Sequence, residues 1–260
     1  MIRATFDELS FDERVWRCLL YWLYNHLGGA ELSWRKLEPF TPMTKGHRVP
    51  TSIERRGFRG NDRAAETINT LIAKGWRRII PTSTGHRGWE QARRAVDDLP
   101  HTGPWSSYRW AGICSVMLDL PIEAPNLGTG GESKTAGPMA ALRALTGKDH
   151  EECKTPALQR AVWTRLAELS EFALPRMEHL ETCLCDFSRM LRGRYYVTAF
   201  IDSKMDEITD AESVLWAARR RAFPAHVLGE LNGWHGLRRE LLTLFRDKGE
   251  TWIPEHPDKS

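Results

Sequence analysis

The chain has 260 residues, of which 41% are hydrophobic and 27% are charged, and its formal net charge is +3. This length and composition exclude a disordered protein and a membrane-spanning one, because no apolar run approaches the ~20 residues that span a bilayer. Five cysteines without a second Cys or His pair at finger-like spacing predict neither a disulfide framework nor a structural zinc site, and they indicate a reducing, cytoplasmic compartment.

The predicted elements are almost all helical. Ser10 is a favourable N-cap for the first helix, which we expect to end at Gly28 and Gly29. Residues 38–62 lack periodicity and are rich in Pro, Gly, Thr and Arg, which predicts a long basic loop. The main strand candidate is the segment 194–201. The spacing of apolar residues predicts helices over 11–27, 61–74, 89–99, 104–119, 138–146, 155–172, 175–192, 210–221 and 233–246.

These elements predict a mostly α fold. We expect one helical domain over residues 1–260. The alternative is a division into two lobes, a basic lobe over 1–98 and a hairpin and catalytic lobe over 99–250. Residues 251–260 are expected to form a loose tail.

The positive charge is concentrated in one part of the sequence. Between Lys45 and Arg94 there are twelve Lys or Arg residues and four acidic ones, a local charge of +8, so the rest of the chain carries −5. Such asymmetry indicates a polyanionic partner, and a solvated basic surface is the alternative. Of the eleven tryptophans, we expect most to lie in the core and the others to be available for stacking.

The most informative segment is Leu99–Ser107, which reads Leu-Pro-His-Thr-Gly-Pro-Trp-Ser-Ser and is followed by an apolar run. Pro100 and Gly103 predict a tight turn, and Pro104 predicts the first position of a new helix. The hydroxyl groups near this turn can cap the helix or hydrogen-bond around its start. Backbone N–H groups and the positive end of the helix dipole would then face outward, where they favour a phosphate. An ordinary turn before a core helix is the alternative.

This segment resembles the hairpin of helix-hairpin-helix DNA glycosylases, whose loops read roughly Leu-Pro-Gly-x-Gly-Pro-Trp-Thr-Ala, with His101 here in place of the first glycine. The resemblance implies a mostly α, helix-hairpin-helix DNA glycosylase-like helical fold. It also implies a hairpin that holds the DNA backbone without reading sequence. The DNA-binding residues expected from the hairpin and the basic loop are Arg55, Arg56, Arg59, His101, Thr102, Gly103, Trp105 and Ser106.

The chain departs from the glycosylases after the apolar helix. Those enzymes carry a catalytic Asp after the Pro of the next turn, whereas this chain has Asn126 after Pro125. An amide does not accept a proton as a carboxylate does. Glu123 lies before the Pro, so the framework resembles a glycosylase while the base-excision chemistry is expected to be lost.

Residues 128–135, Gly-Thr-Gly-Gly-Glu-Ser-Lys-Thr, nearly spell a phosphate-binding P-loop. Ser133 stands where that motif has its second glycine, and the prolines upstream argue against a central strand. We therefore expect no nucleoside triphosphatase. Ser133, Lys134 and Thr135 could still surround phosphate oxygens with N–H groups and one cation, and a flexible linker is the alternative.

A second dense segment runs from Glu178 to Asp206 and combines carboxylates, arginines and two tyrosines. Asp186 and Arg189 have the spacing of a surface ion pair, which is one interpretation. The other is a site that holds a zwitterion or a pyrophosphate. Its candidate residues are Asp186, Arg192, Arg194, Tyr195 and Asp202.

Together, Leu99–Ser107, Gly128–Pro138 and Leu180–Asp202 resemble the amino acid:DNA transferases of bacteriophage thymine hypermodification. These are grouped with the α-glutamyl/putrescinyl-thymine pyrophosphorylases and are related to helix-hairpin-helix glycosylases. The resemblance implies base flipping in duplex DNA and displacement of pyrophosphate from 5-hydroxymethyluracil by the amine of an amino acid.

The resemblance assigns a role to each candidate. The catalytic candidates are Asp186, Asp202 and Glu123, in that order, as proton acceptors, and Lys134 beside the departing pyrophosphate. Ser133, Thr135, Arg192, Arg194 and Tyr195 are expected to bind substrate. The expected partners are modified double-stranded DNA and a free amino acid as co-substrate, in the cytoplasm of a phage-infected bacterium. No metal site or cofactor is assigned, and the need for a divalent metal is left open. The alternatives are a DNA glycosylase and a non-enzymatic DNA-binding module.

Overall fold

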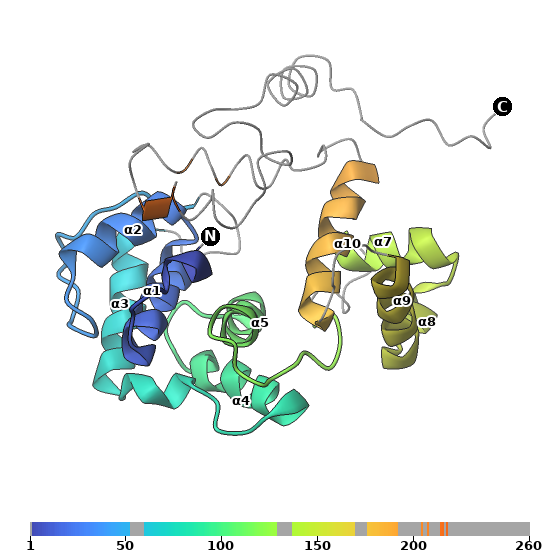
Figure 1. Cartoon of the computed structure of the whole chain (residues 1–260), viewed down its shortest axis with the longest axis horizontal. Coiled ribbons are helices and arrows are strands. Elements are labelled where there is room, and N and C mark those ends of the chain that lie inside the picture. The colour runs from blue at the N-terminus through green and yellow to red at the C-terminus, as the bar shows by residue number, and fades with distance from the viewer. Residues whose placement is uncertain are drawn as a thin grey trace, which may run out of the picture. The chain divides into compact units, whose positions relative to one another are not determined.

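A computed structural model of the chain describes residues 2–52, 60–128, 137–169 and 176–191, together with 204, 207, 214, 215 and 217. Helices make up 69% of the described residues and no strand occurs among them, which confirms the prediction of a mostly α protein (Figure 1). None of the described helices is long and apolar enough to cross a membrane. The strand expected over 194–201, the tail 251–260 and nearly all of the helices expected over 210–221 and 233–246 lie outside the described residues.

The chain divides into two compact units. The first unit comprises Met1–Ile122 and Ser203–Gly233, and the second comprises Glu123–Asp202 and Trp234–Ser260. The basic region and the turn at 98–103 therefore belong to the same unit, whereas the two-lobe alternative places a boundary between them.

Helices of the first unit surround a core that is rich in tryptophan. Trp16, Trp22, Trp89 and Trp110 are all fully buried, and these four tryptophans thus have the core role expected of them. The elements of this unit are η1 (Ile2–Thr5), α1 (Phe11–Tyr24), α2 (Leu27–Lys36), α3 (Asn61–Ala73), η2 (Trp76–Ile79), α4 (Gly85–Asp97), α5 (Pro104–Gly112) and the π-helical turn η3 (Ile113–Met117).

The beginning of α1 confirms the expected N-cap, but its end does not lie where the sequence predicted. The Ser10 hydroxyl accepts a hydrogen bond from the Glu13 N–H, and the Glu13 carboxylate accepts one from the Ser10 N–H, which is a complete capping box. The helix ends at Tyr24, and a second helix begins at Leu27.

Gly28 and Gly29 therefore lie inside α2 and do not terminate α1. A Cβ atom on Gly28 would lie 2.3 Å from the carbonyl oxygen of Glu207, and one on Gly29 would lie 2.0 Å from that of Pro50. The two glycines are needed because other backbone segments approach the first turn of this helix closely.

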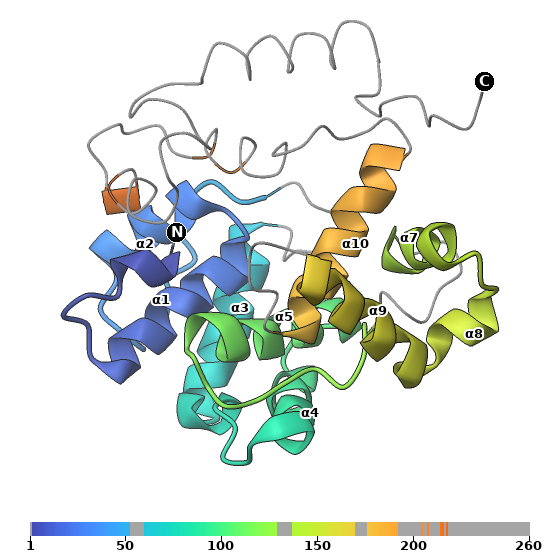
Figure 2. The ribbon, with the colours of Figure 1, turned by 45° about the vertical axis from the view of Figure 1, so that its right-hand side comes forward.

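The second unit is also helical in its described part. Its elements are α7 (Gly137–Thr146), α8 (His150–Lys154), α9 (Pro156–Leu169) and α10 (Met177–Leu191) (Figure 2). Helix α10 packs along α7, and Leu180 and Leu184 are buried together with Leu142 of α7. The helices predicted over 138–146, 155–172 and 175–192 are confirmed within the described residues, and α7 and α9 each begin one residue from the predicted start.

Candidate nucleic-acid interface

The turn 98–103 joins α4 to α5, and these two helices pack against each other. Two buried indoles hold the helix that follows the turn. Trp22 Nε1 donates to the carbonyl oxygen of Ser106 at 2.9 Å, and Trp110 Nε1 donates to that of Ile79 at 3.0 Å. Helix α5 is therefore fixed both to α1 and to η2.

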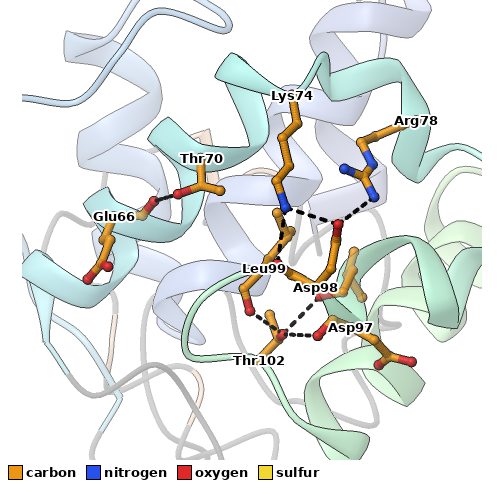
Figure 3. Close-up of polar contacts among 9 residues, drawn as sticks. Glu66, Thr70, Lys74, Arg78, Asp97, Asp98, Leu99 and Thr102 are labelled. Carbon is orange, nitrogen blue, oxygen red and sulfur yellow. Dashed lines mark hydrogen bonds and ion pairs between the residues drawn. The ribbon is translucent and has the colours of Figure 1, made fainter.

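Asp98, at the C-terminal end of α4, attaches the turn to two cations (Figure 3). Its carboxylate accepts hydrogen bonds from Lys74 Nζ at 3.0 Å and from Arg78 Nη2 at 2.8 Å. The hydrogen bond from Lys74, assisted by Arg78 and opposed by desolvation, holds the pKa of Asp98 below its usual value. Asp98 is therefore charged at neutral pH.

Two further contacts hold the tip of the turn on α3. The buried Thr67 hydroxyl lies 2.8 Å from the carbonyl oxygen of Pro100 and donates to it. The imidazole Nε2 of His101 lies 2.7 Å from a carboxylate oxygen of Glu66. Glu66 and Thr67 lie on α3, and Lys74 is the C-cap residue directly after it, about two turns further along.

Thr102 closes the preceding helix. Its hydroxyl donates toward the carbonyl oxygens of Val96 at 2.8 Å and Leu99 at 2.6 Å, which are among the last carbonyls of α4 and the turn. The Val96 carbonyl also accepts from the Leu99 N–H at 3.1 Å, so the hydroxyl is a further donor at the end of this helix, where no next turn of helix follows. The Thr102 hydroxyl thus hydrogen-bonds to the end of α4 and does not cap α5.

Among the described residues, no side chain caps the start of α5. The N-cap position is Gly103, and the Ser107 hydroxyl donates back to its carbonyl oxygen at 2.9 Å. Of the hydroxyl groups expected around this helix start, only that of Ser107 therefore makes a hydrogen bond there within the described part of the chain. The N–H groups of Gly103, Trp105 and Ser106 have no acceptor among the described residues. Together with the helix dipole they form a positive end that favours an anion.

The two positions that correspond to glycines in the glycosylase hairpin have different backbone conformations. His101 has φ of 62°, which is the left-handed region that glycine adopts without strain. Gly103 is extended, with φ of −159°, and a Cβ atom there would meet nothing within 4 Å. The first glycine of the pattern thus stands where this chain has a left-handed backbone, at His101. Nothing in the described fold requires glycine at Gly103.

Ion pairs neutralise part of the charge of the basic region. Among its nine described cations, five have carboxylate partners, and three of these five pair with Asp12 or Asp98, outside the 45–94 window. The paired cations are Arg48, Lys74, Arg77, Arg78 and Arg93. The described cations without an acidic partner among the described residues are Lys45, Arg63, Arg87 and Arg94. The local charge available to a partner is therefore smaller than the sequence count indicates.

Asp186 lies on α10 in the second unit and is half-buried. Burial raises the pKa of its carboxyl, and Arg189 opposes that shift. The ion pair with Arg189 that the spacing suggested is not formed between these two side chains. A carboxylate with a raised pKa accepts a proton more readily, which suits a general base.

Glu123 and Asn126 follow the first unit directly in the sequence. Glu123 is half-buried, and its side chain makes no hydrogen bond or ion pair with another described residue. Asn126 accepts a hydrogen bond from the Gly128 N–H through its side-chain oxygen at 2.7 Å. Its amide therefore shapes a turn at the position where the glycosylases have a carboxylate.

The structure brings together five of the expected site residues, His101, Thr102, Gly103, Trp105 and Ser106, in one turn and the helix that it opens. Ser106 is buried, so its side chain is not open to a ligand. Ten expected residues lie outside the described residues: Arg55, Arg56, Arg59, Ser133, Lys134, Thr135, Arg192, Arg194, Tyr195 and Asp202.

Sequence reasoning did not identify the residues that support the turn, namely Glu66, Thr67, Lys74, Arg78 and Asp98. Their contacts join segments 20 to 35 residues apart, which no local pattern reveals. The one available signal was the position of Asp98 directly before the Pro/Gly turn.

No protein-family model matches this chain, and no curated protein matches it.

Proposed function

We propose that this protein binds duplex DNA through the turn 98–103 and transfers the amine of an amino acid onto pyrophosphorylated 5-hydroxymethyluracil in that DNA, releasing pyrophosphate. The observation that carries the DNA-binding part is the first turn of α5. Together with its N-cap Gly103, it presents three N–H groups without acceptors among the described residues, and no side chain at Gly103 obstructs a phosphate. The specific chemistry comes from the sequence resemblance to the phage transferases.

The turn is supported well enough to hold a phosphate without first being ordered. Thr67, Asp98 and His101 attach it to α3 and to the segment after α3, while α5 is held by indole hydrogen bonds. A preorganised donor group loses less conformational entropy on binding than a mobile one. Contacts of this kind position the DNA backbone and carry no sequence information.

The proposed reaction needs the target base outside the stack. The C–O bond between the methylene carbon and pyrophosphate breaks, a C–N bond to the amino acid forms, and the amine loses a proton. Asp186 is the proposed acceptor of that proton, supported by its raised pKa. Lys134, Ser133 and Thr135 are proposed to neutralise the departing pyrophosphate, and Arg192 or Arg194 to bind the carboxylate of the amino acid. Tyr195 is proposed to line the amino acid site.

One observation favours a second candidate, a DNA-binding module without catalysis. The two carboxylates that hold the turn are both engaged, Glu66 by His101 and Asp98 by Lys74 and Arg78, so neither of them is free to accept a proton. A glycosylase is less well supported, because the Asn126 side chain hydrogen-bonds to the Gly128 N–H where a catalytic Asp would be expected.

Nucleoside mass spectrometry tests the proposal. Duplex DNA containing pyrophosphorylated 5-hydroxymethyluracil is incubated with the protein and mixed amino acids, and unmodified thymine DNA serves as the control substrate. A nucleoside whose mass corresponds to addition of an amino acid, together with released pyrophosphate, supports the transferase. Release of free base would indicate a glycosylase. DNA binding without any change in nucleoside mass would overturn the transferase and support the DNA-binding module.

A further inference from the structure

Helix α4, which leads into the turn, carries two arginines on one exposed face. Arg87 and Arg94 are seven residues apart, so they lie on the same side of the helix about two turns from each other. Both are exposed, and neither has an acidic partner among the described residues. Most other described cations of the basic region are paired, so these two remain available to an external anion.

The arginines border a depression of about 640 Å³ whose wall is fixed. The Gln91 side-chain oxygen accepts hydrogen bonds from the N–H groups of Thr82 at 3.0 Å and Ser83 at 3.1 Å, which holds the preceding loop against α4. Glu90 also lines it, but its carboxylate is 3.2 Å from Arg93. The lining residues are Thr82, Ser83, Arg87, Glu90, Gln91, Arg94 and Ala95.

The charge at this depression is therefore positive. Arg87 and Arg94 contribute two cations without acidic partners among the described residues, and the one acidic lining residue is neutralised by an arginine that does not line the depression. Six of the seven lining residues are polar, so an apolar ligand or an apolar protein surface does not fit. Guanidinium groups that have kept their donors free bind phosphate oxygens well.

We propose that this arginine face of α4, formed by Arg87 and Arg94, is a second contact with the DNA backbone and extends the contact made by the turn 98–103. The inference rests on the DNA binding of the proposed function, not on its chemistry. Arg94 lies one helical turn before Asp98, which is the first residue of the turn. The arginine face of α4 therefore leads directly to the turn 98–103. Seven residues of helix span about 10 Å. A duplex whose axis runs parallel to α4 presents about three phosphates of one strand over that length, because each strand has one phosphate per about 3.4 Å of axis.

The salt dependence of binding to unmodified duplex DNA tests this contact, because it requires no catalysis. The variant R87A/R94A should lower the slope of log affinity against log salt by about 1.8, since each lost phosphate contact contributes about 0.9. The matched control is R143A/R160A, which removes two exposed arginines of the second unit that also lack an acidic partner among the described residues. Its slope should equal that of the wild-type protein.

The other outcomes separate this inference from the proposed function. An unchanged slope for R87A/R94A, or an equal loss in R143A/R160A, overturns the contact but leaves the transferase open to the mass-spectrometric test. Absence of DNA binding by the wild-type protein overturns both. If inorganic pyrophosphate raises the melting temperature of the wild-type protein but not of R87A/R94A, and the DNA slope is unchanged, the face binds a free anion and not a strand.

Discussion

The hydroxyl of Thr67 on α3 donates to the carbonyl oxygen of Pro100 at 2.8 Å, although 33 residues separate them. The same hydroxyl lies 2.8 Å from the carbonyl oxygen of Arg63, and its single hydrogen serves both acceptors. The Thr67 side chain is fully buried, so water does not replace it. This buried hydrogen bond thus fixes the position of the turn relative to α3.

Thr67→Val should loosen the turn while keeping the volume of the side chain. The carbonyl of Pro100 would lose its donor, and we expect the free energy of unfolding to fall by about 1 kcal/mol and DNA affinity to fall with it. Thr70→Val is the matched control, because the Thr70 hydroxyl donates within its own helix, to the carbonyl oxygen of Glu66. Chemical denaturation and DNA titration of both variants check this, and equal effects on affinity would contradict it.

Asp98→Asn should lower stability in a pH-dependent way. Because the folded-state pKa of Asp98 is depressed, chiefly by the hydrogen bond from Lys74, its contribution is present above the unfolded pKa of about 3.9. That contribution is lost as the pH falls through the lower folded pKa. Asp98 and its partners are partly exposed, so the loss at pH 7 should be at most about 1 kcal/mol.

Melting curves between pH 3 and pH 7 measure this effect. The gap in melting temperature between wild type and Asp98→Asn should be largest at pH 7 and should close toward pH 3. Asp97→Asn is the control, because the neighbouring Asp97 side chain has no partner among the described residues. A gap that stays constant over this range would show that the charge of Asp98 does not hold the turn.

Much of the fold followed from local sequence patterns. The cap at Ser10, the helix start at Pro104 and the mostly α class are properties of short segments, and all three are confirmed. The error at Gly28 and Gly29 has a different origin. Glycine there reflects the close approach of distant backbone, and a sequence pattern does not distinguish that need from a helix end.

The sequence predicted the turn of the candidate site, but it did not predict the side chains that hold this turn in place. The Pro/Gly pattern located residues 99–107, yet the side chains that position the turn come from α3 and from Arg78 beyond it. Counting charges also overestimated the basic surface, because Asp12 and Asp98 lie outside the counted window, pair with three of its cations and offset two of its positive charges. Both errors arise from tertiary contacts over long sequence separations.

Gly103→Val should weaken DNA binding without destabilising the protein. The extended backbone of Gly103 accepts any residue, and a Cβ atom there meets nothing within 4 Å, so the free energy of unfolding should change by about 0.5 kcal/mol or less. An isopropyl group would, however, stand between a phosphate and the N–H groups of α5. We expect affinity for duplex DNA to fall at least about tenfold, a loss of about 1.4 kcal/mol.

Gly46→Val provides the control for this substitution, because a Cβ atom added to Gly46 would also enter open space and its backbone is not left-handed. It should change neither the melting temperature nor the affinity. Parallel losses of stability and affinity in Gly103→Val would indicate that the glycine is needed by the fold and not by a ligand.

Asp186→Asn should remove activity while leaving stability unchanged or higher. Burial raises the pKa of Asp186 in the folded state, so its ionisation above the unfolded pKa costs stability, and that cost grows as the pH rises through the folded pKa. Asparagine carries no charge and avoids this cost. At pH 7 we therefore expect the melting temperature of the variant to equal or exceed that of the wild-type protein.

The transfer rate should respond in the opposite direction. An alkylammonium group has a pKa of about 10 and does not attack at neutral pH, so loss of the proton acceptor should slow transfer by about 10²–10⁴-fold at pH 7. The rate should recover in part at higher pH, where free amine is abundant. The acid limb of the wild-type pH profile should lie above the usual Asp value of 3.8, because the pKa of Asp186 is raised, and the variant should lack that limb. Near-normal turnover of Asp186→Asn at pH 7 would pass the role to Asp202 or Glu123.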